Sequence, residues 1–258
     1  MKRILFLFLF GVCCSNVHAA IQEEFITYQQ KDQALEGYVV YDDAIKGPRP
    51  GILVVHDWKG FGEYSRRRAR MLAELGYTAM AVDIYGKGIR PKDNREAAVQ
   101  AGIYKNDRGL MRARIQSAYD VLIRHPQVDA QNMGAIGYCF GGTVVLELAR
   151  SGTKLAGVVS FHGGLATPTP EDAKNIKGKI LVLHGGDDPF VPADEVVAFK
   201  KEMQAAHVDW QLTAYPGAVH GFTNPEAGDD KSKGAAYNPE ADRLSWEKMK
   251  GFFAEVFK

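Results

Sequence analysis

Short apolar runs alternating with longer amphipathic stretches restrict this chain to few architectures. The runs after residue 50 are mostly apolar throughout rather than alternating: GILVVHD (51–57), YTAMAVD (77–83), NMGAIGY (132–138), LAGVVSFH (155–162), KILVLHG (179–185) and VDWQLTAYP (208–216). Helical patterns separate them at 65–76, 94–125, 141–151 and 192–206, and a last one covers 239–257. Strands that are apolar on both faces need helices on both sides, so the pattern predicts an α/β fold with a mostly parallel sheet.

Two β-rich runs precede this alternation. EEFITYQQ (23–30) and ALEGYVVYDD (34–43) flank the polar turn Lys31-Asp32-Gln33. Two such runs joined by a short turn are typical of a β-hairpin. We therefore expect an antiparallel hairpin at the N-terminal side of the sheet.

The first residues have the pattern of an export signal. Lys2 and Arg3 precede an apolar run too short to span a bilayer, and small residues end it at Val17-His18-Ala19. We interpret residues 1–19 as a signal peptide, 20–258 as the mature chain, and the location as periplasmic or secreted. A buried N-terminal strand or a retained anchor is the alternative.

Length, composition and charge indicate that the mature chain is a single globular domain without a nucleic-acid or membrane partner. About 239 residues suffice for one domain with a full core, and we see no linker that would divide it. The formal charge of +1 falls to −1 once Lys2 and Arg3 are removed, and no later segment is apolar enough to cross a membrane. We expect no nucleic-acid partner, no membrane association after signal removal, and a monomer or weak homodimer.

Cys139 is the only cysteine left after residues 1–19 are removed, since the other two are Cys13 and Cys14. It stands in GYCFGG (137–142), between a predicted strand and a predicted helix. This matches the G-x-nucleophile-x-G elbow, with cysteine in place of serine. Glycines allow the tight turn, and the N-terminus of the helix favours a thiolate. A small buried cysteine is the alternative, but it would leave the glycines unexplained.

A nucleophile on such an elbow needs an acid and a base, which follow it in that order along the chain. HGGDDPFVP offers Asp187 and Asp188 after one strand, and AVHGF offers His220 after the next. A loop histidine on the surface and a helix-capping aspartate are the alternatives. Chain order selects His220 over the histidines at 56, 162 and 184, which also lie near strand ends.

The remaining catalytic groups are backbone donors. The N–H of Phe140, directly after the nucleophile, and that of Trp58, in the loop after 51–57, are the expected oxyanion donors. No histidine pair has the spacing of a zinc site, so we predict neither a metal nor a cofactor.

These motifs together resemble the dienelactone hydrolases, cysteine-dependent members of the α/β-hydrolase fold. The similarity covers HDWKG, VDIYGKG, GYCFGG, HGGDDPFVP and AVHGF, which is nearly the whole mature chain. The resemblance implies Cys139 as nucleophile, Asp188 rather than Asp187 as acid, and His220 as base. It also implies oxyanion donors at Trp58 and Phe140.

Two positions depart from the family. Asp57 stands where the family has a glutamate that interacts with the resting cysteine, and its reach is about 1.5 Å shorter. Asn224 stands where the family has an arginine that holds the substrate's carboxylate. Tyr85 and Lys87, with Arg90 nearby, are the expected substrate-binding or activating residues together with Asp57. The polar stretch 222–238 is expected to border the pocket, and a solvated surface excursion is the alternative.

The sequence thus predicts a hydrolase of a small carboxylic ester or lactone that acts through an acyl-cysteine intermediate. One alternative is a non-catalytic homologue that binds a small molecule and has lost activity through the change at Asp57. The other is a redox-active thiol protein, which would normally use a resolving cysteine that the mature chain lacks.

Overall fold

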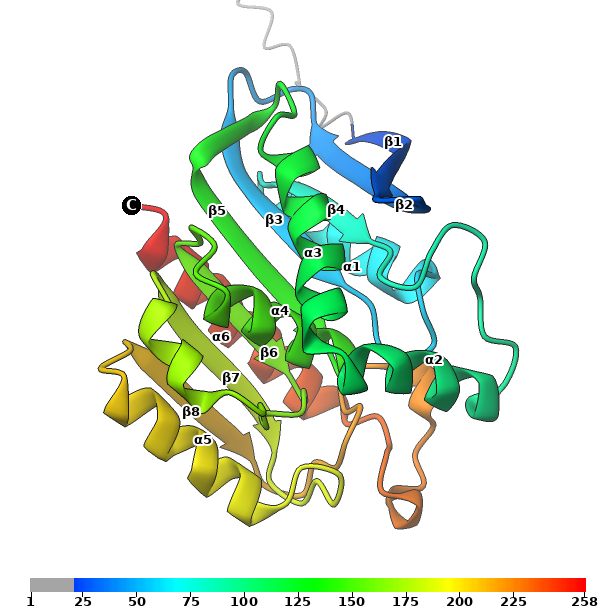
Figure 1. Cartoon of the computed structure of the whole chain (residues 1–258), viewed down its shortest axis with the longest axis vertical. Coiled ribbons are helices and arrows are strands. Elements are labelled where there is room, and N and C mark those ends of the chain that lie inside the picture. Colours follow the sequence, from blue (N-terminus) through cyan, green and yellow to red (C-terminus); the bar gives the residue numbers. More distant parts are fainter. Residues whose placement is uncertain (1–20) are drawn as a thin grey trace, which may run out of the picture.

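One eight-stranded sheet runs through the middle of the molecule, in a computed structural model that describes residues 21–258 (Figure 1). The predicted signal peptide lies outside the described residues. The strands are β1 (Ile21–Gln30), β2 (Gln33–Asp42), β3 (Arg49–Val55), β4 (Thr78–Val82), β5 (Val128–Tyr138), β6 (Gly157–Phe161), β7 (Lys179–Gly185) and β8 (Trp210–Tyr215). Their order is β1-β2-β4-β3-β5-β6-β7-β8, and all pairs from β4 to β8 are parallel.

Helices cover both faces of the sheet. One face carries α1 (Glu63–Glu74) and α6 (Pro239–Val256), and the other carries α2 (Asn94–Asn106), α3 (Arg108–Leu122), α4 (Phe140–Arg150) and α5 (Ala193–Ala205). Each face of the sheet has its own hydrophobic core, and neighbouring residues of β3 point into different ones. Leu53 packs on the face of α2–α5, and Ile52 packs on the face of α1 and α6. Both side chains are fully buried. The continuous apolar strands are therefore explained by burial on both faces, and the predicted α/β-hydrolase architecture is confirmed.

The N-terminal hairpin is also confirmed. β1 and β2 pair antiparallel from Ile21 opposite Asp42 to Gln30 opposite Gln33. Lys31 takes the left-handed conformation that closes the turn, with φ at 51°. β2 then pairs antiparallel with β4, so the hairpin forms one edge of the sheet.

The helical pattern at 94–125 is divided into two helices. Asp107 ends α2, where its N–H donates to Ile103 O, and begins α3, where its carboxylate accepts from the Leu110 N–H at 2.8 Å. An aspartate at this position satisfies a helix N-terminus and disfavours a continuous helix. Three short 3₁₀ turns complete the fold, at Pro170–Asn175, Pro225–Ala227 and Lys231–Lys233.

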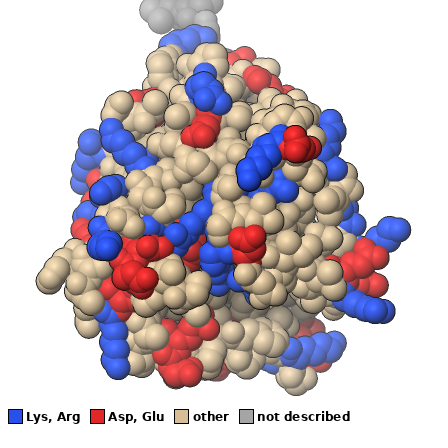
Figure 2. Space-filling model, in the orientation of Figure 1, with Lys and Arg blue, Asp and Glu red and all other residues tan. Residues whose placement is uncertain are grey.

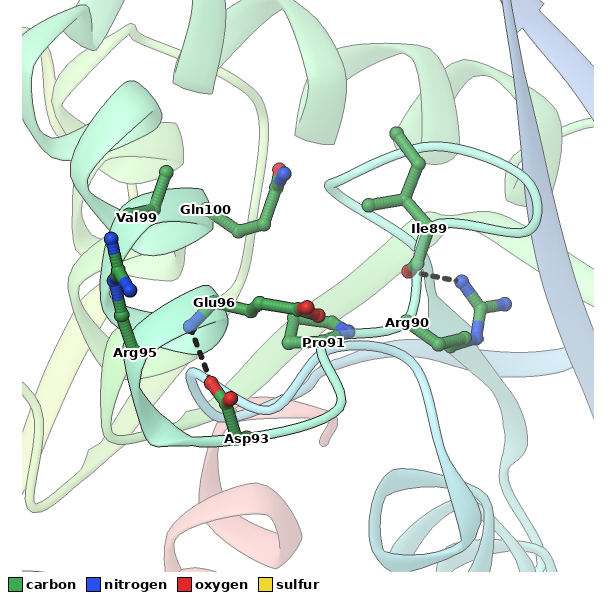
Figure 3. A pocket seen from close by; sticks show the side chains of 8 residues that line it. All are labelled: Ile89, Arg90, Pro91, Asp93, Arg95, Glu96, Val99 and Gln100. Carbon is green, nitrogen blue, oxygen red and sulfur yellow. Dashed lines mark hydrogen bonds between the residues drawn. The ribbon is translucent and has the colours of Figure 1, made fainter.

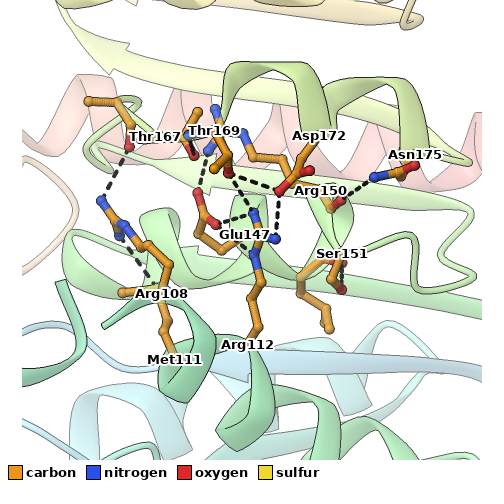
Figure 4. A network of polar contacts seen from close by, with 12 residues as sticks. Arg108, Met111, Arg112, Glu147, Arg150, Ser151, Thr167, Thr169, Asp172 and Asn175 are labelled. Carbon is orange, nitrogen blue, oxygen red and sulfur yellow. Dashed lines mark hydrogen bonds and ion pairs between the residues drawn. The ribbon is translucent and has the colours of Figure 1, made fainter. Parts of the chain in front are cut away.

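A buried network of charges joins the helices on the face of α4 (Figure 4). Glu147 and Arg150 lie on α4, and both side chains are fully buried. The Arg150 guanidinium contacts Glu147 at 3.0 Å and Glu202 of α5 at 2.8 Å. Arg112 of α3 contacts Glu147 and Asp172, each at 2.7 Å. The network therefore ties α3, α4 and α5 together through paired charges.

Arg150→Ala is expected to destabilise the fold by about 3–5 kcal/mol, because it leaves the Glu202 carboxylate buried without its guanidinium partner. Urea unfolding followed by circular dichroism measures the change. Arg243→Ala removes an exposed pair with Glu240 on α6 and serves as the control, with little change in midpoint expected. Equal urea midpoints for the two variants would show that the buried network contributes no more to the free energy of unfolding than an exposed ion pair does.

The surface mixes charges of both signs. On the face shown in Figure 2, acidic and basic side chains are interspersed, and neither sign dominates. Over residues 21–258, the structure contains no helix of the length and apolarity needed to span a bilayer.

Candidate active site

Cys139 lies on a strained turn between β5 and α4. Its backbone has φ 54° and ψ −114°, a conformation that non-glycine residues rarely adopt. A Cβ on Gly137 would lie 2.0 Å from Gly141 O, and one on Gly141 would lie 2.4 Å from Val55 O. Only glycine fits either position, so the two glycines permit a turn that presents the thiol above the sheet.

His220 meets this thiol from the loop after β8. Its Nε2 lies 2.9 Å from Cys139 Sγ. The loop is held by backbone bonds from His220 N–H to Gly234 O at 3.1 Å and from Ala236 N–H to His220 O at 3.0 Å. The imidazole is thus placed within reach of the thiol proton.

Asp188 completes the chain of contacts from the loop after β7. Its Oδ2 accepts from His220 Nδ1 at 2.8 Å, and its Oδ1 accepts from the Phe190 N–H at 2.9 Å. The Asp188 side chain is fully buried. Asp187 donates its N–H to Ala218 O instead and has an exposed side chain. The geometry therefore favours Asp188 over Asp187 as the residue that orients the histidine.

The pKa of His220 is shifted in the opposite direction from the pKa values of the other histidines near strand ends. Burial lowers the pKa of His56 to about 4 and lowers the pKa values of His162 and His184. Burial acts in the same direction on His220, but the charge of Cys139 and hydrogen bonds with Asp188 and Cys139 outweigh it and raise the pKa to about 10. His220 is therefore the histidine suited to hold a proton beside a thiolate.

The two expected oxyanion donors lie on neighbouring segments. Phe140 is the first residue of α4, so its N–H has no acceptor within the helix. The loop carrying Trp58 follows β3, and its start packs on α4: the His56 ring stacks on Phe140 at 5.8 Å between centroids. The Trp58 carbonyl accepts from the Tyr85 hydroxyl at 3.0 Å, which fixes this loop against Tyr85.

Asp57 and Asn224, the two departures from the family pattern, interact with each other. Burial raises the pKa of Asp57, while the backbone bond from Lys59 and a side-chain hydrogen bond with Asn224 offset part of this rise. Asp57 Oδ1 accepts from the Lys59 N–H at 2.8 Å. Burial also raises the pKa of Tyr85, with further contributions from the charges of Cys139 and Asp57. Tyr85 is thus close to both Cys139 and this carboxylate.

The structure does not bring Lys87 to the triad. Its Nζ donates to Thr27 Oγ1 on β1 at 3.0 Å. β1 is the edge strand, four strand spacings from β5, or about 19 Å. Arg90 is held by Glu36 of β2 and lines a hollow of about 400 Å³ beside the N-terminus of α2 (Figure 3). Lys87 is therefore engaged away from Cys139 and His220, and the guanidinium of Arg90 is paired with Glu36.

The polar stretch 222–238 folds back onto the histidine loop. Asn238 N–H donates to Phe222 O at 3.0 Å, and Tyr237 N–H donates to Gly228 O at 2.6 Å. The ideal Cβ position on Gly234 lies 3.0 Å from the Phe190 ring, which itself packs edge-on against the His220 ring with centroids 5.5 Å apart. The stretch therefore borders the site, as its length and polarity indicate.

Sequence reasoning missed the roles of Phe190, His162 and Thr223. Phe190 is more than half exposed although it contacts His220, which makes it a candidate contact for a substrate. His162 and Thr223 contact the elbow and the histidine loop. The position of His162 at the end of β6 was the available signal, but many buried histidines lie at such positions for packing alone.

Among residues 21–258, no group of three or more histidine, cysteine, aspartate or glutamate side chains could hold a metal ion. Cys139 is a free thiol.

Comparison with known proteins identifies the family of this chain. The sequence model of the dienelactone hydrolase family matches residues 35–257. A putative carboxymethylenebutenolidase from Synechocystis is 26% identical over 257 residues, covering 92% of this chain and 98% of the relative.

Solved structures agree with this relationship. The structure named m3DLH is 40% identical, with a TM-score of 0.89, and the match covers 93% of this chain and all of the other. The dienelactone hydrolase-like promiscuous phosphotriesterase P91, from metagenomic libraries, is 38% identical with the same TM-score and the same coverage.

Proposed function

Because the chain belongs to the dienelactone hydrolase family, we propose that it hydrolyses a small carboxylic ester or lactone through an acyl-cysteine intermediate. Cys139 is the nucleophile, His220 the base and Asp188 the orienting acid. The observation that carries this proposal is the continuous set of contacts from Cys139 Sγ through His220 to Asp188, at 2.9 and 2.8 Å. The names of the Synechocystis relative and of m3DLH support an ester or lactone as the bond that is cleaved.

Acylation begins with the thiolate of Cys139. His220 holds the proton taken from the thiol, and Asp188 stabilises the resulting imidazolium. The sulfur attacks the carbonyl carbon and a new C–S bond forms. The carbonyl oxygen takes the negative charge, which the N–H groups of Phe140 and Trp58 stabilise. The C–O bond then breaks, and His220 gives its proton to the departing alcohol or enol.

Deacylation uses the same groups in the reverse order. His220, now neutral, removes a proton from water, and the resulting hydroxide attacks the thioester carbon. The C–S bond breaks, the acid leaves, and the thiolate and imidazolium are restored. In a lactone, the alcohol and the acid remain parts of one product molecule.

The acyl-enzyme itself tests the proposal. Rapid acid quenching of the protein after mixing with p-nitrophenyl acetate is expected to show a mass increase of one acetyl group, located on the peptide that contains Cys139. Cys139 is the only cysteine among residues 21–258, so acetylation of another peptide in this range would fall on a different kind of nucleophile, such as a lysine. Turnover without any acetylated Cys139 peptide would exclude the acyl-cysteine route.

A further inference from the structure

His162 is a second buried histidine beside the triad, and the mechanism above does not use it. It follows β6, it is 2% exposed, and its ring centroid lies 5.3 Å from that of His220. Its backbone φ of 40° is unusual for a residue other than glycine. A buried polar residue with a strained backbone is normally held in place by hydrogen bonds.

Both nitrogens of His162 have partners on catalytic segments. Nδ1 accepts from the Cys139 N–H at 3.1 Å, a donor shared with Phe161 O at 3.0 Å. Nε2 lies 2.7 Å from Thr223 Oγ1. A backbone N–H can only donate, so Nδ1 carries no hydrogen, and Nε2–H donates to the threonine hydroxyl.

The imidazole of His162 is neutral. Burial, and next the nearby charge of His220, hold its pKa well below the usual range. A second positive charge at this distance would oppose the imidazolium of His220. The neutral ring instead provides one acceptor and one donor without disturbing the ion pair.

The far end of this link is anchored to two helices. Thr223 Oγ1 lies 2.6 Å from the Tyr64 hydroxyl on α1, and its carbonyl accepts from Arg68 Nη2 at 2.8 Å. Arg68 also contacts Asp242 of α6 at 2.5 Å. Thr223 itself stands three residues after His220. Holding Thr223 therefore holds the loop that carries the base.

We infer that His162 is a positioning residue for the proposed reaction: its neutral imidazole joins the Cys139 N–H to the Thr223 hydroxyl and so locks the nucleophile elbow to the base loop. The inference rests on the proposed function for the roles of Cys139 and His220. The distance between Sγ and Nε2 depends on the relative position of two loops that come from different strands. The His162 ring is a rigid connection between them.

Thr223→Val tests the link, because it keeps the side-chain volume and removes the acceptor of His162 Nε2–H. We expect kcat for p-nitrophenyl acetate to fall by about 10-fold while KM stays within about 2-fold, since a small misplacement of reacting groups lowers kcat. Alkylation of Cys139 by iodoacetamide should slow by a similar factor, and its pH profile should change. Thr223→Ser keeps the hydroxyl and is expected to remain within about 3-fold of the parent in both measurements.

Thr78→Val is the matched control. Thr78 is fully buried, its hydroxyl donates to Gln127 O at 3.0 Å, and it lies at the start of β4, the end of the sheet opposite the triad. We expect its kcat and its alkylation profile to equal those of the parent. The inference is overturned if Thr223→Val behaves as Thr78→Val does.

A second variant keeps the test valid if Thr223→Val folds poorly. His162→Asn tolerates a positive φ but is too short to bridge the two loops. Its effect should match that of Thr223→Val, and the double variant should add no further loss, because both changes break one link. Fully additive losses would contradict the link. If Cys139→Ala retains turnover, the proposed function fails. The link is still tested in that case, because the alkylation rates of Cys139 in the parent, Thr223→Val and Thr78→Val do not depend on turnover.

Discussion

Cys139→Ala is expected to lower kcat/KM for p-nitrophenyl acetate by about 10⁴-fold or more, because no other group in the site can form the covalent intermediate. The residual rate would come from the oxyanion donors and from binding. Stopped-flow or steady-state release of p-nitrophenol measures the loss.

The folded state of this variant is readily checked. Cys139 is only partly buried, so Cys139→Ala should keep a cooperative thermal transition and a circular dichroism spectrum like that of the parent. Cys139→Ser keeps the shape of the elbow but has a weaker nucleophile. Its kcat/KM is expected to lie between that of the parent and that of Cys139→Ala. Parent-like turnover by Cys139→Ala would mean that hydrolysis occurs elsewhere and that the triad assignment is wrong.

His220→Ala is expected to lower kcat by about 10³-fold or more and to slow alkylation of Cys139 by iodoacetamide at neutral pH. Without the imidazolium, the thiolate loses its counter-charge at 2.9 Å. Alkylation rates measured from pH 5 to about 10 would show the change directly.

An exposed histidine provides the control. His207 lies in the turn after α5 at a positive φ of 54°, so His207→Asn removes an imidazole without a steric penalty. Its alkylation and turnover should match those of the parent. Identical alkylation profiles for His220→Ala and His207→Asn would show that His220 does not support the thiolate.

The raised pKa of His220 also sets the pH dependence of its contribution to folding. Because the folded-state pKa of about 10 lies above the unfolded value of 6.5, the contribution is full below about pH 6.5 and is lost as pH rises toward about 10. Thermal midpoints of the parent should therefore fall over this interval more steeply than those of His220→Ala.

Much of the fold could be predicted from periodicity. The run KILVLHG corresponds to β7 without any change of bounds, since a short apolar segment between turns leaves little freedom. The helical pattern at 94–125 does not show that it forms two helices. An aspartate such as Asp107 occurs both inside helices and at helix caps, and only the different directions of α2 and α3 in the structure distinguish the two. The register and order of the strands likewise depend on packing between distant segments.

The contacts among Cys139, Asp188 and His220 could be predicted because each residue follows a strand and their order along the chain is restricted. The surrounding residues could not. Lys87 stands two residues after Tyr85, yet its side chain turns toward β1 while the Tyr85 ring packs against Phe140 of the elbow. Side-chain direction in a loop depends on local backbone angles, and sequence spacing does not determine it. The contact between Asp57 and Asn224 joins positions 167 residues apart, which no local pattern could indicate.

The backbone bonds at the two ends of the stretch 222–238 have an evolutionary consequence. Gly234, Ala236 and Asn238 bond back to the segment around His220, so the base is held by the ends of this excursion and not by its middle. Insertions between Gly228 and Lys231, both of which accept backbone bonds from the second end of the stretch, would then alter the rim of the site without moving the imidazole. Descendants of such a chain could acquire new substrates by changing this loop alone, while the reacting groups stay where they are.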